Sequence, residues 1–308
     1  MLARRIARRL IVPAAYAVVA VLLVTGLWPH VAPRLTSLGT GATTATAPRS
    51  TGGSDRVASN EYDASDGQPT DEMQVAIESV RRFSDEPSLQ LEGGLRTDGG
   101  DRRAYYYLES VRIERGEDVF KVDAATDEVI EATFRSRLTS TLVPLDLSFD
   151  DAAWLAERYA RARFAGFEAL ALVDRATRPN DTVPVYSFKW TRVATSGAEL
   201  PLSVSVAVSS SSGEVIWYLA QRDPLTVDVM PTVTRERAIE TARNWVGDRD
   251  LRWDTSVPSA VRLQVLYDDD DEQQLVWSIS FSGGAGAERP SLRLLVDAHN
   301  GRILTPAS

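Results

Sequence analysis

The stretch LRLLVDAHNGRIL, residues 292–304, gathers side chains that could do chemistry. His299 stands two residues after Asp297 and is followed by an asparagine and a glycine. A histidine that binds a metal or acts as a base needs a second ligand or a positioned carboxylate, and Asp297 is its only obvious neighbour. The other histidine, His30, lies far away in the sequence, so no H-E-x-x-H motif is formed. We therefore expect His299 to be an exposed turn residue.

An acidic run, DDDDE at residues 268–272, could attract a cation. It does not match an EF-hand calcium loop, because such loops alternate their ligands around a central glycine. The run lies between two segments rich in strand-forming residues, which favours a solvated loop. Weak cation binding by this loop stays open, and no specific metal site is predicted.

Two further groups could support hydrolysis. The serines at 209–212 lack a G-x-S-x-G motif and a histidine placed to act as their base. Paired carboxylates drawn from Asp150, Asp151 and Glu157 remain an alternative, although the sequence singles out no pair. The sequence therefore predicts a protein that is not an enzyme, with no catalytic residue, no cofactor and no metal.

Charge and composition narrow the class of protein. The chain has 308 residues and a formal net charge of -9, and its basic residues are concentrated near the start, since residues 1–34 hold five arginines and no acid. The remainder is therefore strongly acidic, which argues against nucleic-acid binding. The absence of cysteine excludes disulfides, thiolate metal sites, a cysteine nucleophile and a lipidated cysteine.

The N-terminal region predicts attachment to a membrane. A basic segment at 1–9 precedes an uncharged apolar stretch at 10–28, about as long as the ~20 residues that cross a bilayer. The arginines place the N-terminus in the cytoplasm and the body outside. A cleaved signal peptide is the competing interpretation, and both export the body. Residues 29–69 are rich in small polar residues and are expected to form a disordered linker.

A hairpin pattern recurs three times in the rest of the chain. Each copy joins two segments rich in Val, Ile and Leu through a turn, as strands of a hairpin are joined. Corresponding turn positions hold Asp127, Gly213 and Gly301, which suit a residue with positive φ, and Asp123 and Asp297 can fix the turn by hydrogen-bonding the backbone. The three copies read VFKVDAATDEVIEA (119–132), SVAVSSSSGEVIWY (205–218) and RLLVDAHNGRILTP (293–306).

A helical pattern precedes each hairpin, with apolar residues on one face and a capping residue at the start. These segments lie at 70–83, 148–164 and 234–246, and further strand patterns follow each of them. We expect an α+β fold of tandem units, each with one helix packed on a short antiparallel β-meander, after one N-terminal transmembrane helix. The predicted units are 70–140, 141–224 and 225–308, of which the first is the most divergent.

The helix VTRERAIETARNWV, the strand LVWSISF and the hairpin LLVDAHNGRIL together resemble the PepSY family. PepSY units combine a helix, a "vWxV" strand and a closing "vDaxtGeVl" hairpin. The resemblance covers residues 233–304 well, 148–219 moderately and 70–134 weakly, where Ser209 replaces the aspartate of the second copy and Asp127 the glycine of the first.

The resemblance implies binding rather than catalysis. PepSY units occur in pro-regions of secreted metallopeptidases and in membrane-anchored envelope proteins that partner cell-wall hydrolases. By this fold-level analogy, the chain would bind and regulate a separate envelope protein such as a peptidase or hydrolase. A peptide- or glycan-binding sensor ectodomain is the alternative. Trp217 and Tyr218, at the end of a hairpin strand, are the candidate interaction surface, with core packing as the default interpretation.

Overall fold

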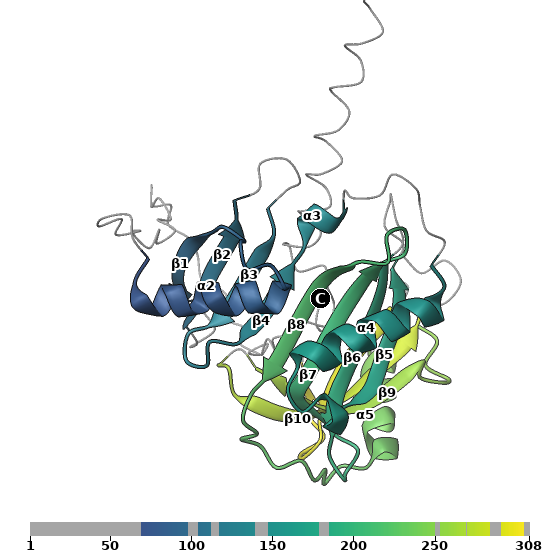
Figure 1. Cartoon of the computed structure of the whole chain (residues 1–308). Helices are drawn as coiled ribbons and strands as arrows, with labels where there is room; N and C mark the ends of the chain where they lie inside the picture. Colours follow the sequence, from purple (N-terminus) through teal and green to yellow (C-terminus); the bar gives the residue numbers. More distant parts are fainter. Residues whose placement is uncertain are drawn as a thin grey trace, which may run out of the picture. The chain divides into compact units, whose positions relative to one another are not determined.

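The computed structural model describes residues 69–97, 104–111, 117–138, 147–178, 185–249, 253–268, 270–283 and 291–304 (Figure 1). The predicted anchor at 10–28, the basic segment before it and the linker up to residue 68 lie outside these ranges. Among the residues that are described, no helix is both long enough and apolar enough to cross a membrane.

The three longer helices form where the sequence predicts them. Each begins after a hydroxyl side chain whose oxygen accepts the backbone N–H three residues later, an arrangement that satisfies one of the unpaired donors of the first turn. The helices are α2 (Asp71–Ser84), α4 (Phe149–Arg163) and α5 (Arg235–Gly247). The capping hydrogen bonds join Thr70 to Met73 at 3.2 Å, Ser148 to Asp151 at 3.1 Å, and Thr234 to Arg237 at 3.3 Å.

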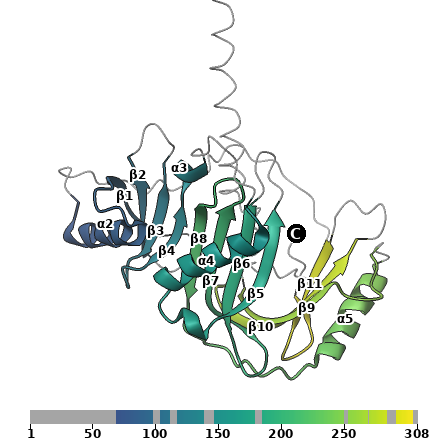
Figure 2. The ribbon, with the colours of Figure 1, turned by 45° about the vertical axis from the view of Figure 1, so that its right-hand side comes forward.

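The chain divides into two compact units. The larger contains the described residues up to Pro231, together with 262–265. Its strands pair antiparallel in the order β1-β2-β3-β4-β8-β7-β6-β5 (Figure 2). They are β1 (Leu91–Thr97), β2 (Ala104–Ser110), β3 (Val119–Asp123), β4 (Val129–Thr133), β5 (Ala171–Arg178), β6 (Val185–Val193), β7 (Glu199–Ser209) and β8 (Val215–Arg222), with two short helices, α3 (Arg135–Leu138) and the 3-10 helix Phe167–Ala169.

The core of the larger unit lies between this sheet and the two helices α2 and α4. Figure 1 shows α2 across the strands β1–β4 and α4 across β6 and β7. Buried residues of both helices belong to one apolar cluster with the strands, for example Val80 of α2, Phe120 of β3, Ala156 of α4 and Val206 of β7. Burial of this apolar area is the main favourable contribution to the free energy of folding.

The smaller unit combines α5 with the last four strands of the chain. These are β9 (Ala260–Tyr267), whose centre groups with the larger unit, β10 (Gln273–Ser282), β11 (Ser291–Asp297) and β12 (Ile303–Leu304). Small side chains of α5, Ala238 and Ala242, let the helix pack closely on Ile279, Phe281 and Leu294.

The expected architecture, tandem α+β units with separate meanders, is wrong. In the described residues the twelve strands belong to one mixed sheet, in which β4 pairs antiparallel with β8 and β7 pairs parallel with β9 at Glu199 and Gln264. The physical reason is that a meander leaves unpaired N–H and C=O groups along its outer strands, and pairing two such edges satisfies them. The alternation of apolar and polar residues in the sequence indicates which face of a strand is buried. It does not indicate which neighbouring strand pairs with each edge. The unit boundaries at 140 and 224 stay a prediction.

Candidate functional site

The three hairpin turns hold their key residues in the left-handed backbone region. Asp127 has φ 55°, Gly213 φ 69° and Gly301 φ 77°. A residue with a Cβ is strained there, and aspartate is among the least strained, so Asp127 replaces glycine at a modest cost. These positions shape the turns and bring no reactive group toward another.

The turn aspartates hydrogen-bond their own backbone. Oδ1 of Asp123 accepts the N–H groups of Ala125 and Thr126, both at 2.9 Å. Oδ1 of Asp297 accepts the N–H of His299 at 2.7 Å and that of Asn300 at 3.1 Å. Both carboxylates are thus engaged in turn geometry, which makes them poor metal ligands or bases.

His299 is half-buried rather than exposed, which corrects the expectation from the sequence. Its Nε2 is enclosed and has no hydrogen-bond partner among the described residues. No group of three or more His, Cys, Asp or Glu side chains that could hold a metal ion occurs in the described part of the chain.

In the acidic run at 268–272, the described residues 268 and 270–272 are organised around the carboxylate of Asp268. Its Oδ1 accepts the N–H of Asp270 at 3.0 Å and that of Glu272 at 2.9 Å, while its Oδ2 accepts the side-chain amide of Gln274 at 2.6 Å. Asp271 takes a positive φ of 59°. The carboxylate of Asp268 therefore organises the loop.

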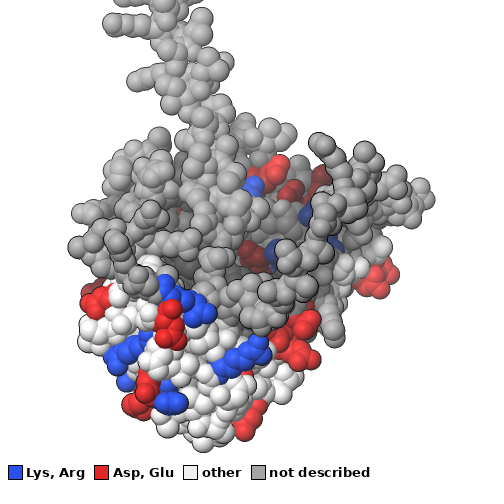
Figure 3. All heavy atoms as spheres, turned by 180° about the vertical axis from the view of Figure 1, so that it is seen from behind, with Lys and Arg blue, Asp and Glu red and all other residues white. Residues whose placement is uncertain are grey.

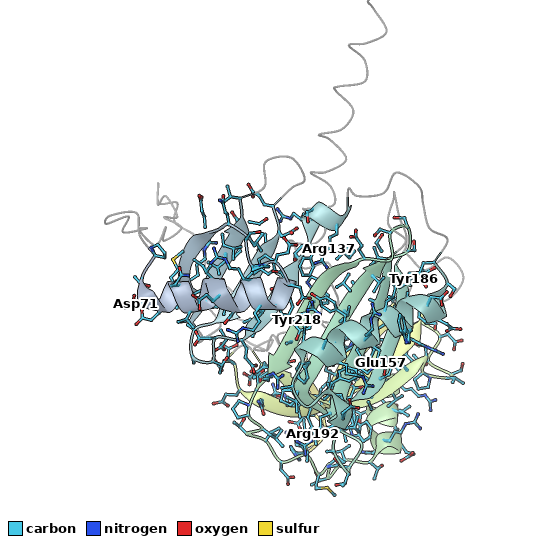
Figure 4. The ribbon with its side chains drawn as sticks, viewed as in Figure 1. Asp71, Arg137, Glu157, Tyr186, Arg192 and Tyr218 are labelled. Atoms are coloured by element: carbon cyan, nitrogen blue, oxygen red, sulfur yellow. The ribbon has the colours of Figure 1, made fainter. Side chains whose placement is uncertain are left out.

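Trp217 and Tyr218 are buried, with 5% and 1% of their surface exposed. The Nε1 of Trp217 donates to Glu131 at 3.4 Å, across the β4–β8 pairing. Tyr218 points to the helix side, where its ring lies 4.9 Å from that of Phe83 in an edge arrangement. Both side chains therefore lie in the core of the larger unit, and Tyr218, which is labelled in Figure 4, also lines a cavity.

This cavity, of about 240 Å³, is the candidate functional site of the larger unit. Four segments meet around it: the end of α2, the β3–β4 turn, the end of α4, and β8. Its apolar wall includes Phe83, Val129, Ala162 and Tyr218. Below, "the arginine cavity" denotes this site, because three guanidinium groups, those of Arg82, Arg163 and Arg222, also line it.

Arg163 is held in a fixed position at the wall. Its Nε donates to the backbone carbonyl of Phe83 at 2.9 Å, and one terminal nitrogen lies 2.7 Å from the carboxylate of Asp85. Its guanidinium carbon stacks 3.9 Å above the ring of Tyr159. The side chain of Arg163 is only 15% exposed, and its bonds tie α4 to the end of α2.

Arg222, at the end of β8, is held in a similar way. Its Nε lies 2.9 Å from a carboxylate oxygen of Glu128, and another nitrogen donates to the carbonyl of Ala165 at 3.1 Å. Its guanidinium stacks 3.8 Å above the ring of Phe164. This residue therefore joins β8 both to the β3–β4 turn and to the segment after α4.

Arg82 and Asp127 are the two lining charges without a described side-chain partner. Arg82 is exposed on the last turn of α2, and Asp127 is half-buried in the turn. With Glu128, the lining comprises three guanidinium groups and two carboxylates, and the carboxylate of Asp85, which pairs with Arg163 just outside the lining, balances the third positive charge. The arrangement can bind an anionic group next to an apolar one.

Buried phenols under the cavity have displaced pKa values. Burial raises the pKa of Tyr159 to about 12, and the guanidinium groups of Arg163 and Arg137 partly oppose this. Burial also raises the pKa of Tyr218, again against an opposing effect of the nearby Arg222. Both phenols therefore stay neutral at ordinary pH and contribute apolar rings rather than proton transfer.

Reasoning from the sequence missed this cavity. The bonds of Arg163 reach residues about 80 positions earlier in the chain, a separation that no local motif records. One available signal was the placement of arginines in the last turns of α2 and α4, which sequence rules assign to the helix dipole. Elsewhere, basic and acidic side chains intermix over the described part of the face in Figure 3.

Comparison with known proteins gives distant structural likenesses, of which two are described here. No family model matches the chain, and no curated protein matches it. The Bacillus megaterium YpeB C-terminal domain is similar with 16% identity and a TM-score of 0.46, over 76% of this chain and 95% of that one. A protein of Clostridium difficile 630 described as a lipoprotein has 13% identity and a TM-score of 0.20, over 55% and 97%. With TM-scores below 0.5, neither likeness assigns a fold or a function, and the PepSY resemblance continues to rest on the sequence motifs.

Proposed function

We propose that this chain is a non-catalytic, membrane-anchored PepSY-type protein that acts outside the cytoplasm by binding a protein partner. The partner class that we favour is a peptidase or cell-wall hydrolase, whose activity the bound chain regulates. The sequence motifs of residues 233–304 support the family, and the basic and apolar N-terminal segments support the location.

The arginine cavity is the observation that carries this proposal. It combines positioned guanidinium groups with an apolar floor, a combination that suits planar anionic groups joined to apolar ones. Its volume of about 240 Å³ is below the ~300 Å³ at which pockets for drug-sized ligands begin. A site of this size suits one or two residues of a larger partner, whose remaining contacts lie on the surrounding surface.

Site-directed photo-crosslinking in intact cells tests the proposal. A photoreactive amino acid replaces Ala162, which is exposed at the cavity, in the full chain. The control position is Arg192 of β6, which is also exposed but does not line the cavity (Figure 4). We expect an envelope peptidase or hydrolase to be crosslinked at 162 and not at 192. Identical products at both positions, or none at 162, would count against the proposal.

Regulation requires a separate measurement. The crosslinked enzyme, once purified, is assayed with and without the full chain in detergent. A saturable change in turnover, in either direction, supports regulation, while an unchanged turnover in a complex that has formed limits the role of the chain to binding.

A peptide-binding sensor is the second candidate, because the same cavity could hold the end of a free peptide. The two functions differ in what the surrounding surface does. If a free peptide binds as tightly as a whole partner protein carrying the same sequence, the sensor function is favoured, since contacts outside the cavity then add no affinity.

A further inference from the structure

The guanidinium groups of the arginine cavity have unused hydrogen-bond donors. An arginine offers five N–H groups, and the described bonds of Arg163 and Arg222 each use Nε and one terminal nitrogen. The remaining terminal nitrogen of each has no described partner, and Arg82 has none at any nitrogen. Because stacking on aromatic rings fixes Arg163 and Arg222, their donors are ordered before a ligand arrives.

An apolar wall lies directly beside these donors. Phe83 and Tyr218 meet edge to face, and Val129 and Ala220 continue the wall along β4 and β8. A ligand that fills the cavity must therefore present an anion and an apolar group at neighbouring atoms. A ligand with only an anion would leave the apolar wall without a partner. A ligand with only an apolar group would leave the guanidinium donors without one.

We propose that the arginine cavity binds the C-terminal residue of a polypeptide, its carboxylate against the guanidinium groups and its apolar side chain against Phe83, whose ring is backed by the buried Tyr218. The inference rests on the proposed function, since it names the part of the partner that is bound. In a C-terminal residue the carboxylate and the side chain share one Cα, so both fit a cavity of about 240 Å³. An internal glutamate or aspartate brings a carboxylate without an apolar group beside it.

The arginines also have a structural role, which the experiment must separate from binding. Arg163 and Arg222 tie segments together, so their removal would weaken the fold and the site at once. Arg82 is different, because it is exposed and its side chain makes no described hydrogen bond or ion pair. Ala162 is exposed as well, so a larger side chain there fills the cavity without entering the core.

Isothermal titration of the full chain in detergent provides the test. The probe is N-acetyl-Ala-Ala-Phe with a free carboxylate, compared with its C-terminal amide and with N-acetyl-Ala-Ala-Glu-amide. We expect saturable binding of the free acid. Both amides should bind at least about tenfold more weakly, as expected for the loss of charged hydrogen bonds at the C-terminal position. Arg82→Gln should weaken binding of the acid about fivefold or more. Ala162→Trp should abolish it, and Arg192→Gln, which removes the same charge elsewhere, should leave it unchanged.

Each other outcome overturns the inference. Equal binding of acid and amide would show that no carboxylate is recognised, and equal binding of the glutamate peptide would show that the C-terminus is not. Wild-type affinity in Arg82→Gln, or no binding of the acid, would remove the cavity as its site. A partner crosslinked at 162 would still support the proposed function in these cases, so the two failures are distinguishable.

Discussion

Replacing Arg163 by methionine should destabilise the larger unit more than any exposed charge change. Methionine keeps the apolar part of the side chain, so the core contacts of the stem are preserved. The guanidinium is lost, and with it the hydrogen bond to the carbonyl of Phe83, the ion pair with Asp85 and the stacking on Tyr159.

The three lost interactions differ in magnitude. A charge-assisted hydrogen bond contributes about 1.5–3 kcal/mol, and its loss leaves the carbonyl of Phe83 unpaired. Stacking of a largely buried guanidinium on Tyr159 contributes about 0.5–2 kcal/mol. The ion pair contributes about 0–1 kcal/mol, because Asp85 is 80% exposed. Since such terms are not additive, we expect the free energy of unfolding to fall by about 2–4 kcal/mol.

Two variants serve as matched controls. Asp85→Asn removes only the exposed partner and should cost less than about 1 kcal/mol. Arg249→Met makes the same replacement at the corresponding position after α5, where the exposed guanidinium stacks 4.0 Å above the ring of Trp245 but hydrogen-bonds only to the carbonyl of that residue, at 3.4 Å, among the described contacts. It should also cost about 1 kcal/mol or less.

Urea unfolding of the chain without residues 1–68 measures these effects, followed by circular dichroism and by tryptophan fluorescence. Coincident transitions permit the use of free energies. A loss below about 1 kcal/mol in Arg163→Met, or an equal loss in Arg249→Met, would refute the view that the bond to the end of α2 is the stabilising contact.

Three further predictions follow from single contacts. Gly93→Ala should detach β1 from β2, because a Cβ would lie 1.9 Å from the carbonyl oxygen of Tyr107, and hydrogen exchange should show protection lost in these two strands alone. Asp118→Ala should cost about 1–3 kcal/mol in thermal unfolding, because the two carboxylate oxygens of this buried residue accept the N–H and the hydroxyl of Ser136, each at 2.9 Å, and alanine offers no acceptor to either donor. Stability should be full below pH 10 and decline as the pH rises toward 12, because burial raises the pKa of Tyr159 to about 12 in the folded chain. Tyr159→Phe should reduce that alkaline decline in pH-dependent melting curves.

Local structure was predictable from the sequence because short-range physics determines it. A hydroxyl residue before an apolar stripe marks the start of α2, α4 and α5, since the unpaired N–H groups of a helix are satisfied within three residues. The turn residues take positive φ for equally local reasons, as Gly213 and Gly301 show. In each case the partner atoms lie within a few positions of each other in the chain.

Sheet assembly and the arginine cavity were not predictable in this way. The pairing of Ala132 with Tyr218 joins strands that are far apart in sequence, and many edges of similar composition could compete for the same partner. Tyr218 illustrates the consequence. Its position at the end of a hairpin strand left two interpretations open, core packing and an interaction surface. The sequence does not show that α2 and α4 cover the face on which the ring lies and bury it to 1% exposure.

Arg163 and Arg249 show why a repeat in the sequence does not repeat a site. Each follows an aromatic residue by four positions, stacks on that ring, and occupies the same place relative to its helix cap. Only Arg163 is buried against the end of another helix, where its bond to Phe83 makes one wall of the cavity. The arginine cavity therefore depends on the contact between the first and second copies, and a stacked arginine alone does not create a second site at α5. Ligand binding should then be lost when residues 69–138 are removed, although the motifs of the PepSY resemblance are strongest in the retained part.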